Sequence, residues 1–402
     1  MNTIGIIIEY NPFHNGHNYH IKQAKVKSDA EFVVGIMSGN YVQRGEPAII
    51  NKWDRTKIAL NHGVDMVIEL PTIYSTQSAE GFAKGSISTL ASSGIIDGII
   101  FGSEAGVISP LKKVAQEILE IERTPKLITN KLKEGISYSK TLQKLTANNN
   151  FLSGSNNILG IEYIKQNIKL GSPLKVETIK RKNSTYNEAT PNNDFFTSAT
   201  SLRSMIKNQS KELSNYIPPK ALSTLKYTQK KQQFIEINSF TDYLFPLLIK
   251  DGYKLIPKTQ GYEKGLENRI MQALFDGKPK DIETLVSQVN SKRYSRSRIN
   301  RLLLHFMLGV EKETVIKANI ETPYLKILGC SEKGLKLLHK LKKKSAVPYS
   351  LNYKNLLDSL PKKGLGYQLL ASENIYSNLY IQQSFIHKKY NLEFRHKPII
   401  VK

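Results

Sequence analysis

Residues 1–101 of this chain alternate between unbroken apolar runs and helical patterns, and this alternation constrains the fold more than any other feature. The apolar runs occupy residues 4–9, 31–37, 65–71 and 95–101. Because polar residues do not alternate within them, they are typical of parallel strands buried on both faces. Helical patterns lie between them, at residues 17–27, 52–62 and 78–93. The pattern predicts a doubly wound, Rossmann-like α/β fold, in which right-handed crossovers bring the carboxyl ends of the strands to one ligand-binding edge.

The rest of the chain has a different pattern. Residues 174–180 are typical of one more strand, residues 182–196 of a polar loop, and a helix is expected to begin near Thr200. Strand signals become rare after residue 219, and helical patterns follow at residues 240–250, 265–274, 281–289, 296–308 and 331–344. We therefore predict an α/β domain over residues 1–215 and a mainly helical domain over residues 216–402.

Charge is distributed unevenly along the chain. The formal net charge is +24; residues 1–200 carry 22 Lys and Arg against 18 Asp and Glu, whereas residues 201–402 carry 36 against 16. This imbalance predicts chemistry in the first domain and binding of a polyanion by the second. A lysine-rich genome with solvated charged faces is the alternative, but such a bias should act on both halves.

Three further features concern the compartment. No run of about 18 apolar residues predicts a membrane span, and the first residues lack the basic start of a signal peptide. The single cysteine, Cys330, excludes an internal disulfide. We therefore expect a cytoplasmic protein with no membrane partner.

The segment after the first predicted strand carries the first candidate site. It reads His14-Asn15-Gly16-His17, where an α/β fold places a phosphate-binding loop. Gly16 has no Cβ, so the backbone can approach a ligand closely, and the free N–H groups of the helix start favour phosphate. Two imidazoles can stabilise the charge that develops on an α-phosphate. A zinc site with His20 as a third ligand, or two unrelated surface histidines, are the alternatives.

A second helix start also has phosphate-binding character. In residues 198–203 (SATSLR), a hydroxyl can cap the free N–H groups, and Arg203 can bind phosphate oxygens bidentately. An ordinary N-cap explains this segment equally well when it is taken alone. Two such helix starts in one α/β chain, the first of them carrying two histidines, favour nucleotide binding.

Given these two motifs, the chain resembles the nucleotidyltransferase superfamily with the HIGH motif. Residues 14–17 match its H-x-G-H signature, and residues 198–203 are similar to its second signature, I-S-S-T-x-x-R, with a departure at Ala199. More narrowly, the chain resembles the bacterial tRNA(Met) cytidine acetate ligase family. The segments that carry this resemblance span most of the chain, at residues 5–17, 37–45, 64–71, 156–163 and 292–298.

The resemblance implies an enzyme that forms acetyl-adenylate and pyrophosphate from acetate and ATP. It also implies transfer of the acetyl group to N4 of the wobble cytidine of elongator tRNA(Met), giving N4-acetylcytidine. His14 and His17 would then stabilise the α-phosphate, Arg203 would hold pyrophosphate, and Mg²⁺ would accompany ATP. The implied ATP contacts, in which Asn156 and Asn157 fit equally well, are Ile7, Ile8, Glu9, Tyr10, Asn11, Pro12, Phe13, Asn15, Gly16, His20, Gly102, Asn156, Asn157, Arg181, Ser198 and Thr200.

Polar residues also follow the second predicted strand. Asn40, Gln43 and Arg44 lie on the ligand edge if the sheet is parallel. They could position acetate or cytidine, and capping of the loop explains them equally well. The sequence names no general base for acetyl transfer.

A basic run provides the best candidate for RNA binding. Basic residues interleaved with one aromatic residue suit phosphate contacts together with stacking on a base. A solvated helix face is the alternative. The predicted contacts are Lys292, Arg293, Tyr294, Arg296, Arg298 and Arg301.

Two other functions remain open at this point. An adenylyltransferase acting on a small phosphate acceptor needs the same two phosphate motifs, but it does not need a strongly basic second half. A non-catalytic RNA-binding protein with a relic nucleotide fold explains the charge, but not the intact His14, Gly16, His17 and Arg203.

Overall fold

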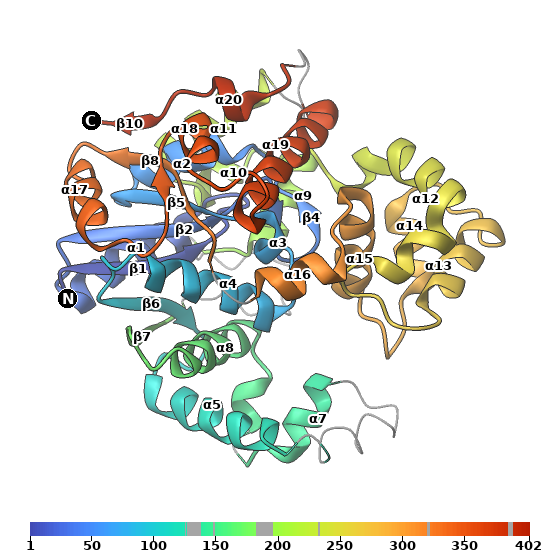
Figure 1. The fold of residues 1–402 in the computed structure, drawn as a ribbon, viewed down its shortest axis with the longest axis horizontal. Helices are drawn as coiled ribbons and strands as arrows, with labels where there is room; N and C mark the ends of the chain where they lie inside the picture. The colour runs from blue at the N-terminus through green and yellow to red at the C-terminus, as the bar shows by residue number, and fades with distance from the viewer. Residues whose placement is uncertain are drawn as a thin grey trace.

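An eight-stranded sheet forms the centre of the protein, with the order β10-β8-β5-β2-β1-β6-β7 and with β9 beside β8 (Figure 1). The structure is a computed structural model that describes residues 1–124, 126, 138–147, 149–181, 196–231, 234–319, 322–384 and 389–402. Strands β5, β2, β1, β6 and β7 are parallel to one another, and β8 runs antiparallel to β5. The predicted α/β fold with a mostly parallel sheet is confirmed.

The strands of the first half follow the apolar runs. They are β1 (Thr3–Ile8), β2 (Phe32–Ser38), β5 (Met66–Leu70), β6 (Gly98–Ser103) and β7 (Lys175–Lys180). A small hairpin, β3 (Tyr41–Val42) and β4 (Glu46–Pro47), follows β2. Strand β6 begins at Gly98, later than the apolar run, because Asp97 comes before it. The Asp97 carboxylate accepts hydrogen bonds from the backbone N–H groups of Asn2 (2.7 Å) and Thr3 (2.9 Å).

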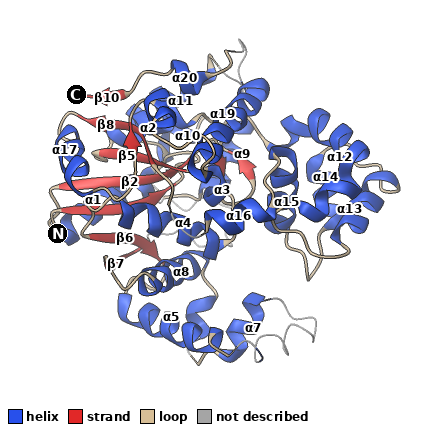
Figure 2. Ribbon diagram, in the orientation of Figure 1, coloured by secondary structure: helices blue, strands red, loops and turns tan. Residues whose placement is uncertain are grey.

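Helices cover both faces of the sheet, as a doubly wound fold requires (Figure 2). Alternate residues of β1, namely Ile4, Ile6 and Ile8, pack with one set of helices. This set comprises α1 (Asn15–Ser28), α2 (Lys52–Asn61), α9 (Ala199–Lys207), α10 (Leu213–Tyr216) and α11 (Pro219–Gln229). The opposite face packs against α3 (Thr72–Ser75), α4 (Ala79–Ser92), α5 (Ile108–Glu122), α7 (Tyr138–Leu145), the 3₁₀ turn η1 (Asn149–Leu152) and α8 (Ser155–Lys169).

A helical unit projects from the sheet at the right of Figure 1. Its elements are η2 (Ile237–Phe240), α12 (Thr241–Leu255), η3 (Ile256–Lys258), α13 (Leu266–Phe275), α14 (Ile282–Val289), α15 (Arg296–Leu308) and α16 (Lys312–Ala318). The predicted helices in this part of the chain are therefore present. No helix of the described residues is long and apolar enough to span a membrane.

The last part of the chain returns to the sheet, which the sequence did not predict. It contributes β8 (Leu325–Ser331), β9 (Tyr349–Ser350) and β10 (Ile399–Val401), with α17 (Leu335–Lys344), α18 (Tyr353–Asp358), α19 (Leu365–Ser384) and α20 (Leu392–Arg395) around them. The sheet thus combines residues from both sides of the predicted 215/216 boundary. The predicted loop at residues 182–196 lies, except for Phe196, outside the described residues.

Candidate active site

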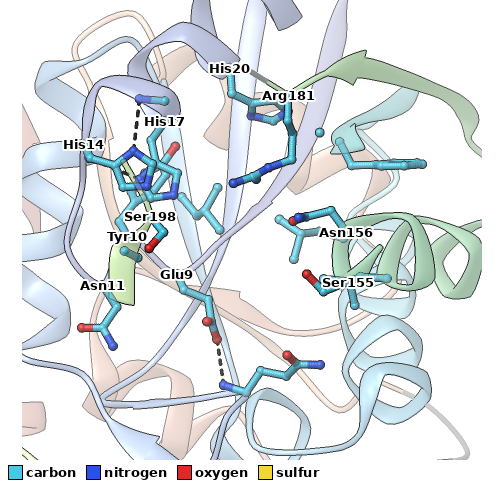
Figure 3. A pocket seen from close by; sticks show the side chains of 18 of the residues that line it. Glu9, Tyr10, Asn11, His14, His17, His20, Ser155, Asn156, Arg181 and Ser198 are labelled. Atoms are coloured by element: carbon cyan, nitrogen blue, oxygen red, sulfur yellow. Dashed lines mark hydrogen bonds between the residues drawn. The ribbon is translucent and has the colours of Figure 1, made fainter. Parts of the chain in front are cut away.

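A cavity of about 310 Å³ lies at the carboxyl ends of β1, β6 and β7 (Figure 3). Helices α1, α8 and α9 all begin at its wall, so three helix N-termini lie beside it. Most of the residues that the resemblance implied are part of its lining. They are Ile7, Ile8, Glu9, Tyr10, Asn11, His14, Gly16, His17, His20, Gly102, Asn156, Arg181, Ser198, Thr200 and Arg203.

Four implied residues, Pro12, Phe13, Asn15 and Asn157, are not part of the described lining. Phe13 is buried and contacts the ring of His17. The Asn15 side chain donates to the backbone carbonyl of Asn215 in α10 (2.9 Å). Asn157 Oδ1 accepts from the backbone N–H of Ala105, which follows β6 (3.0 Å). Of the two asparagines that fit equally well in the sequence, Asn156 is part of the lining and Asn157 is not.

The two histidines of the first motif use the same ring atom in the same way. His14 is the N-cap of α1, and its Nδ1 accepts the backbone N–H of Gly16 (3.1 Å). His17 Nδ1 accepts the backbone N–H of His14 (3.3 Å), and the two rings stack with their centroids 3.7 Å apart. Because each Nδ1 is an acceptor, each neutral ring carries its proton on Nε2. The arrangement therefore presents two uncharged N–H donors.

Burial keeps these rings uncharged. It lowers the pKa of His14 to about 3 and that of His20 to about 4, and the nearby Arg181 guanidinium acts in the same direction. Burial also lowers the pKa of His17 well below its usual value, assisted by His14, Arg181 and His20. The zinc alternative gains no support, because the described residues contain no cluster of three or more His, Cys, Asp or Glu that could hold a metal.

Arg203 connects the second motif to the first. Ser198 is the N-cap of α9, and its side chain accepts the backbone N–H of Ser201 (3.1 Å). Arg203 donates from Nη1 to the backbone carbonyl of Asn11 (3.0 Å) and from Nη2 to Thr200 Oγ1 (3.2 Å). Asn11 and Arg203, which are 192 residues apart in the sequence, thus belong to one wall of the cavity.

The opposite wall is formed by the ends of β6 and β7 and the start of α8. A Cβ on Gly102 would lie 3.1 Å from Arg181 Cγ, so glycine leaves room beside that side chain. Glu104 accepts hydrogen bonds from the backbone N–H groups of Asn156 (3.1 Å) and Asn157 (2.7 Å) and from the Asn156 amide (2.8 Å). Burial acts to raise the pKa of Glu104, but these hydrogen bonds outweigh it and lower the pKa. Glu104 therefore acts as a built-in anion at the start of α8.

Glu9 extends from the end of β1 into the cavity wall (Figure 3). Its Oε1 accepts hydrogen bonds from Ser38 Oγ (3.0 Å) and from the backbone N–H of Gln43 (2.8 Å). Burial raises the pKa of Glu9 in spite of these bonds and of the Arg55 and Arg44 charges.

The lining also includes residues that sequence reasoning did not assign to it. They are Tyr19, Val42, Glu46, Phe82, Phe101, Ser155, Leu159, Tyr163, Ile179, Lys180, Phe196, Thr197 and Ala199. Only the position of Ser155 and Lys180 at element ends gave a usable signal, because most of the others are ordinary apolar or aromatic residues. Gln43 and Arg44, expected at the ligand edge, do line the cavity.

The β3–β4 hairpin that carries Gln43 and Arg44 rests on α15. Arg301 Nη1 donates to the backbone carbonyl of Gln43 (3.4 Å). At the hairpin turn, Gly45 has φ +78°, and a Cβ there would lie 2.4 Å from the backbone nitrogen of Arg301. The helical unit thus fixes one wall of the cavity.

The predicted RNA-binding residues cluster at the start of α15, but acidic partners pair with three of them. Arg293 and Arg298 both pair with Glu263, the latter at 2.6 Å. Their guanidinium groups also lie over the ring of Tyr294, which is only 8% exposed. The ring is covered in this arrangement, and stacking of Tyr294 on a base stays a prediction.

The remaining predicted RNA-binding residues are either exposed or face inward. Lys292 is exposed, and Arg296 pairs with Glu283 at 3.6 Å on the surface. Arg301 instead faces inward, and burial lowers its pKa to about 10. Arg301 therefore supports the hairpin and is not placed to meet a nucleic acid.

The fold and the cavity together define a nucleotidyl transferase of the HIGH class, and a sequence model of the HIGH Nucleotidyl Transferase family matches residues 1–391. Among curated proteins, the tRNA(Met) cytidine acetate ligases of Thermoanaerobacter sp. (strain X514) and Clostridium novyi (strain NT) are each 39% identical, over 100% of both chains. The crystal structure of apo Thermotoga maritima TmcAL has a TM-score of 0.91 at 31% identity, and the form bound with alpha-thio ATP has 0.90 at 31%, each covering 100% of both chains. The chain belongs to the tRNA(Met) cytidine acetate ligase family.

Proposed function

We propose that this protein activates acetate with ATP, forming acetyl-adenylate, and transfers the acetyl group to N4 of the wobble cytidine of elongator tRNA(Met). The observation that carries the proposal is the wall in which Arg203 joins the starts of α1 and α9 beside two stacked, neutral histidines. Full-length relatives are named tRNA(Met) cytidine acetate ligase, and a relative of the same fold is bound with alpha-thio ATP.

The adenylation step needs positioning and charge stabilisation more than a protein nucleophile. An acetate oxygen attacks the α-phosphorus, and negative charge grows on the phosphate oxygens as pyrophosphate leaves. The Nε2–H groups of His14 and His17 donate to these oxygens, and Arg203 with the start of α9 holds the departing pyrophosphate. Neutral donors suit this task, because no attraction between a positive ring and a negative product has to be broken when the product leaves.

The opposite wall is the proposed place of the nucleoside. Gly102 allows close approach of the ribose and adenine, Asn156 offers an amide, and Arg181 provides a cation between the nucleoside and the phosphates. Mg²⁺ would arrive bound to the triphosphate. The lining suits that role, since Glu9 and Glu46 are its only acids among the described residues and Mg²⁺ usually keeps several waters.

The acceptor cytidine must leave its stack to reach the cavity. Gln43 and Arg44 lie at the rim of the cavity on the hairpin, and α15 supports that hairpin from behind. We therefore place the tRNA on the side of the molecule formed by the hairpin and the start of α15.

The predicted RNA-binding residues at the start of α15, which we call the α15 patch, provide a test of this placement. Replacing Arg296 and Arg298 with Ala should weaken tRNA binding and lower the slope of log affinity against log salt by about 1 for each lost phosphate contact. Acetate-dependent ATP–pyrophosphate exchange should stay unchanged. Lys250→Ala, an exposed cation on α12, is the control. An unchanged tRNA affinity and salt slope in the double variant would remove this surface from the proposal.

One incubation tests the function as a whole. The protein is mixed with ATP, labelled acetate and total tRNA, and the tRNA is then digested to nucleosides. Label in N4-acetylcytidine is the expected result. ATP–pyrophosphate exchange that does not depend on acetate would instead indicate an adenylyltransferase for a small phosphate acceptor. No ATP turnover would indicate a non-catalytic RNA-binding protein.

A further inference from the structure

The cavity contains a carboxylate that neither adenylation nor phosphate binding explains, since a carboxylate repels phosphate. We propose that Glu9 is the general base of acetyl transfer and that it takes the proton from N4 of the cytidine as this nitrogen attacks the acetyl-adenylate. The inference rests on the proposed function and assigns a catalytic residue within it.

The geometry leaves one oxygen of Glu9 for this task. Ser38 Oγ and the backbone N–H of Gln43 both donate to Oε1, at 3.0 and 2.8 Å. Among the described residues no hydrogen bond is made to Oε2. The carboxylate is thus held in one orientation with an acceptor oxygen left over, and Glu9 is part of the cavity lining. This is the arrangement that a general base requires, because a fixed base reaches its proton without reorganisation.

The histidines of the cavity are poor candidates for the same role. The Nδ1 atoms of His14 and His17 already accept backbone N–H groups, so their free ring atoms are donors. The pKa of His14 is lowered to about 3, and a ring of that basicity takes up a proton weakly at neutral pH. The second acid of the described lining, Glu46, accepts from the Asn300 side chain (3.3 Å).

The groups around Glu9 act on its pKa in opposite directions. Burial raises its pKa, which makes it a stronger proton acceptor than an exposed glutamate. Two cations limit the rise. Buried Arg55 donates to the backbone carbonyl of Glu9 (2.8 Å), and Arg44 faces it from the hairpin. The Tyr163 hydroxyl of α8 is a further titratable neighbour, and its pKa lies well above the usual value because of burial and Glu9.

The proposed step balances as follows. The N4 lone pair forms a bond to the acetyl carbon, and the carbonyl π electrons move to oxygen. As that carbonyl re-forms, the bond between the acetyl carbon and the phosphate oxygen breaks, and AMP leaves with the electron pair. One N4 proton passes to Glu9 Oε2, which gives a neutral carboxyl group that later loses the proton to water. The products are N4-acetylcytidine, AMP and one proton.

The test separates the two half-reactions in the full-length enzyme. Glu9→Gln should change acetate-dependent ATP–pyrophosphate exchange far less than acetyl transfer, because a carboxylate does not bind the phosphates directly. Single-turnover acetyl transfer to tRNA should fall by roughly 100-fold or more. The wild-type transfer rate should rise with pH as Glu9 loses its proton, and the Glu9→Gln rate should not follow that rise.

Two further variants control the test. Glu9→Asp keeps the carboxylate and should restore part of the transfer rate together with its pH dependence. Glu177→Gln changes a surface glutamate of β7 that pairs with Lys27 (3.1 Å), and it should behave as wild type. Loss of exchange in both Glu9 variants, or transfer at the wild-type rate in Glu9→Gln, overturns the assignment. Absence of N4-acetylcytidine with the wild-type enzyme instead overturns the proposed function itself.

Discussion

The chemistry proposed for single residues depends on which nitrogen of each histidine carries a proton. The backbone N–H groups of His14 and Gly16 occupy both Nδ1 atoms, and burial keeps the rings neutral. The donors that remain are oriented by the same turn that starts α1. The phosphate-binding loop is therefore preorganised by its own backbone.

Loss of one donor tests this arrangement. His17→Ala should lower acetate-dependent ATP–pyrophosphate exchange by about 10²–10³-fold, the usual effect of removing one preorganised donor. Affinity for tRNA should hardly change, because the proposed RNA surface lies on the helical unit. His339→Ala, on the exposed side of α17, serves as the matched control. Equal loss of exchange and of tRNA binding would contradict the separation of the two sites.

The lowered histidine pKa values also predict a pH profile. The folded pKa of His14 is about 3, below the usual value near 6.5, so the ring is neutral throughout the range from pH 8 to pH 5.5. The rate of acetate-dependent exchange at saturating ATP and Mg²⁺ should therefore show no loss with an apparent pKa near 6.5. Such a loss, measured across this range, would mean that a histidine with an ordinary pKa limits adenylation.

The candidate residues of the site were predictable from the sequence, but their protonation states and contacts were not. His14, His17 and Arg203 stand out because their spacing matches a phosphate loop and a helix start. The low pKa values arise from burial and from Arg181, which reaches the loop only when β7 pairs beside β6. Likewise, Tyr294 has the composition of a stacking residue, and only the folded contacts reveal that two arginines cover it.

Among the elements, the β3–β4 hairpin makes the connection between the sheet and the helical unit. Its turn fits α15 so closely that Gly45 has no room for a Cβ, and Asn300 and Arg301 bind the hairpin on either side of that contact. Two cavity residues, Gln43 and Arg44, are carried by this turn. Its placement therefore matters for the site as well as for packing.

A pair of glycine variants separates the cost of the left-handed backbone from the cost of overpacking against α15. Gly45 (φ +78°) and Gly171 (φ +81°) share a left-handed backbone, but only Gly45 meets a neighbouring atom. Gly171→Ala should lower the free energy of unfolding by about 1–2 kcal/mol, the cost of the backbone conformation. Gly45→Ala should lose about 1–3 kcal/mol more through overpacking. Urea denaturation measures both, and equal losses would show that the contact with α15 contributes nothing.

The sequence predicted the elements that are local and missed those that depend on distant partners. Strands β1 and β2 follow uninterrupted apolar runs, which identify buried parallel strands. Strand β8 is also buried, but Lys326 interrupts its apolar pattern. A lysine is tolerated there because Glu69 and Glu393 are brought to it by the fold, and no local pattern reveals this.

At the scale of the whole molecule, this ionic cluster holds the end of the chain to its beginning. Lys52 pairs with Glu69 and Glu393, each at 2.5 Å, and Lys326 pairs with the same two carboxylates. All four side chains are at most 7% exposed. Burial acts to lower the pKa of Lys326, and the two carboxylates outweigh it and raise that pKa. The cluster therefore unites α2, β5, β8 and α20.

Breaking the cluster at one residue should be costly. Lys326→Met leaves buried carboxylates with one cation fewer and should lower the free energy of unfolding by about 3–5 kcal/mol. Lys207→Met, which removes an exposed pair with Glu236, should cost about 1 kcal/mol or less. Thermal and urea unfolding compare the two variants. Similar small losses would show that the buried cluster relaxes without its lysine.

The carboxylate of Glu104 makes the two sides of the cavity electrostatically different. Of the three helix starts at the wall, that of α8 is already occupied by this internal anion, whereas those of α1 and α9 are capped by the uncharged side chains of His14 and Ser198. A triphosphate is repelled from the first and attracted to the other two. We therefore expect a nucleotide to bind with its triphosphate toward the starts of α1 and α9 and its nucleoside toward the start of α8.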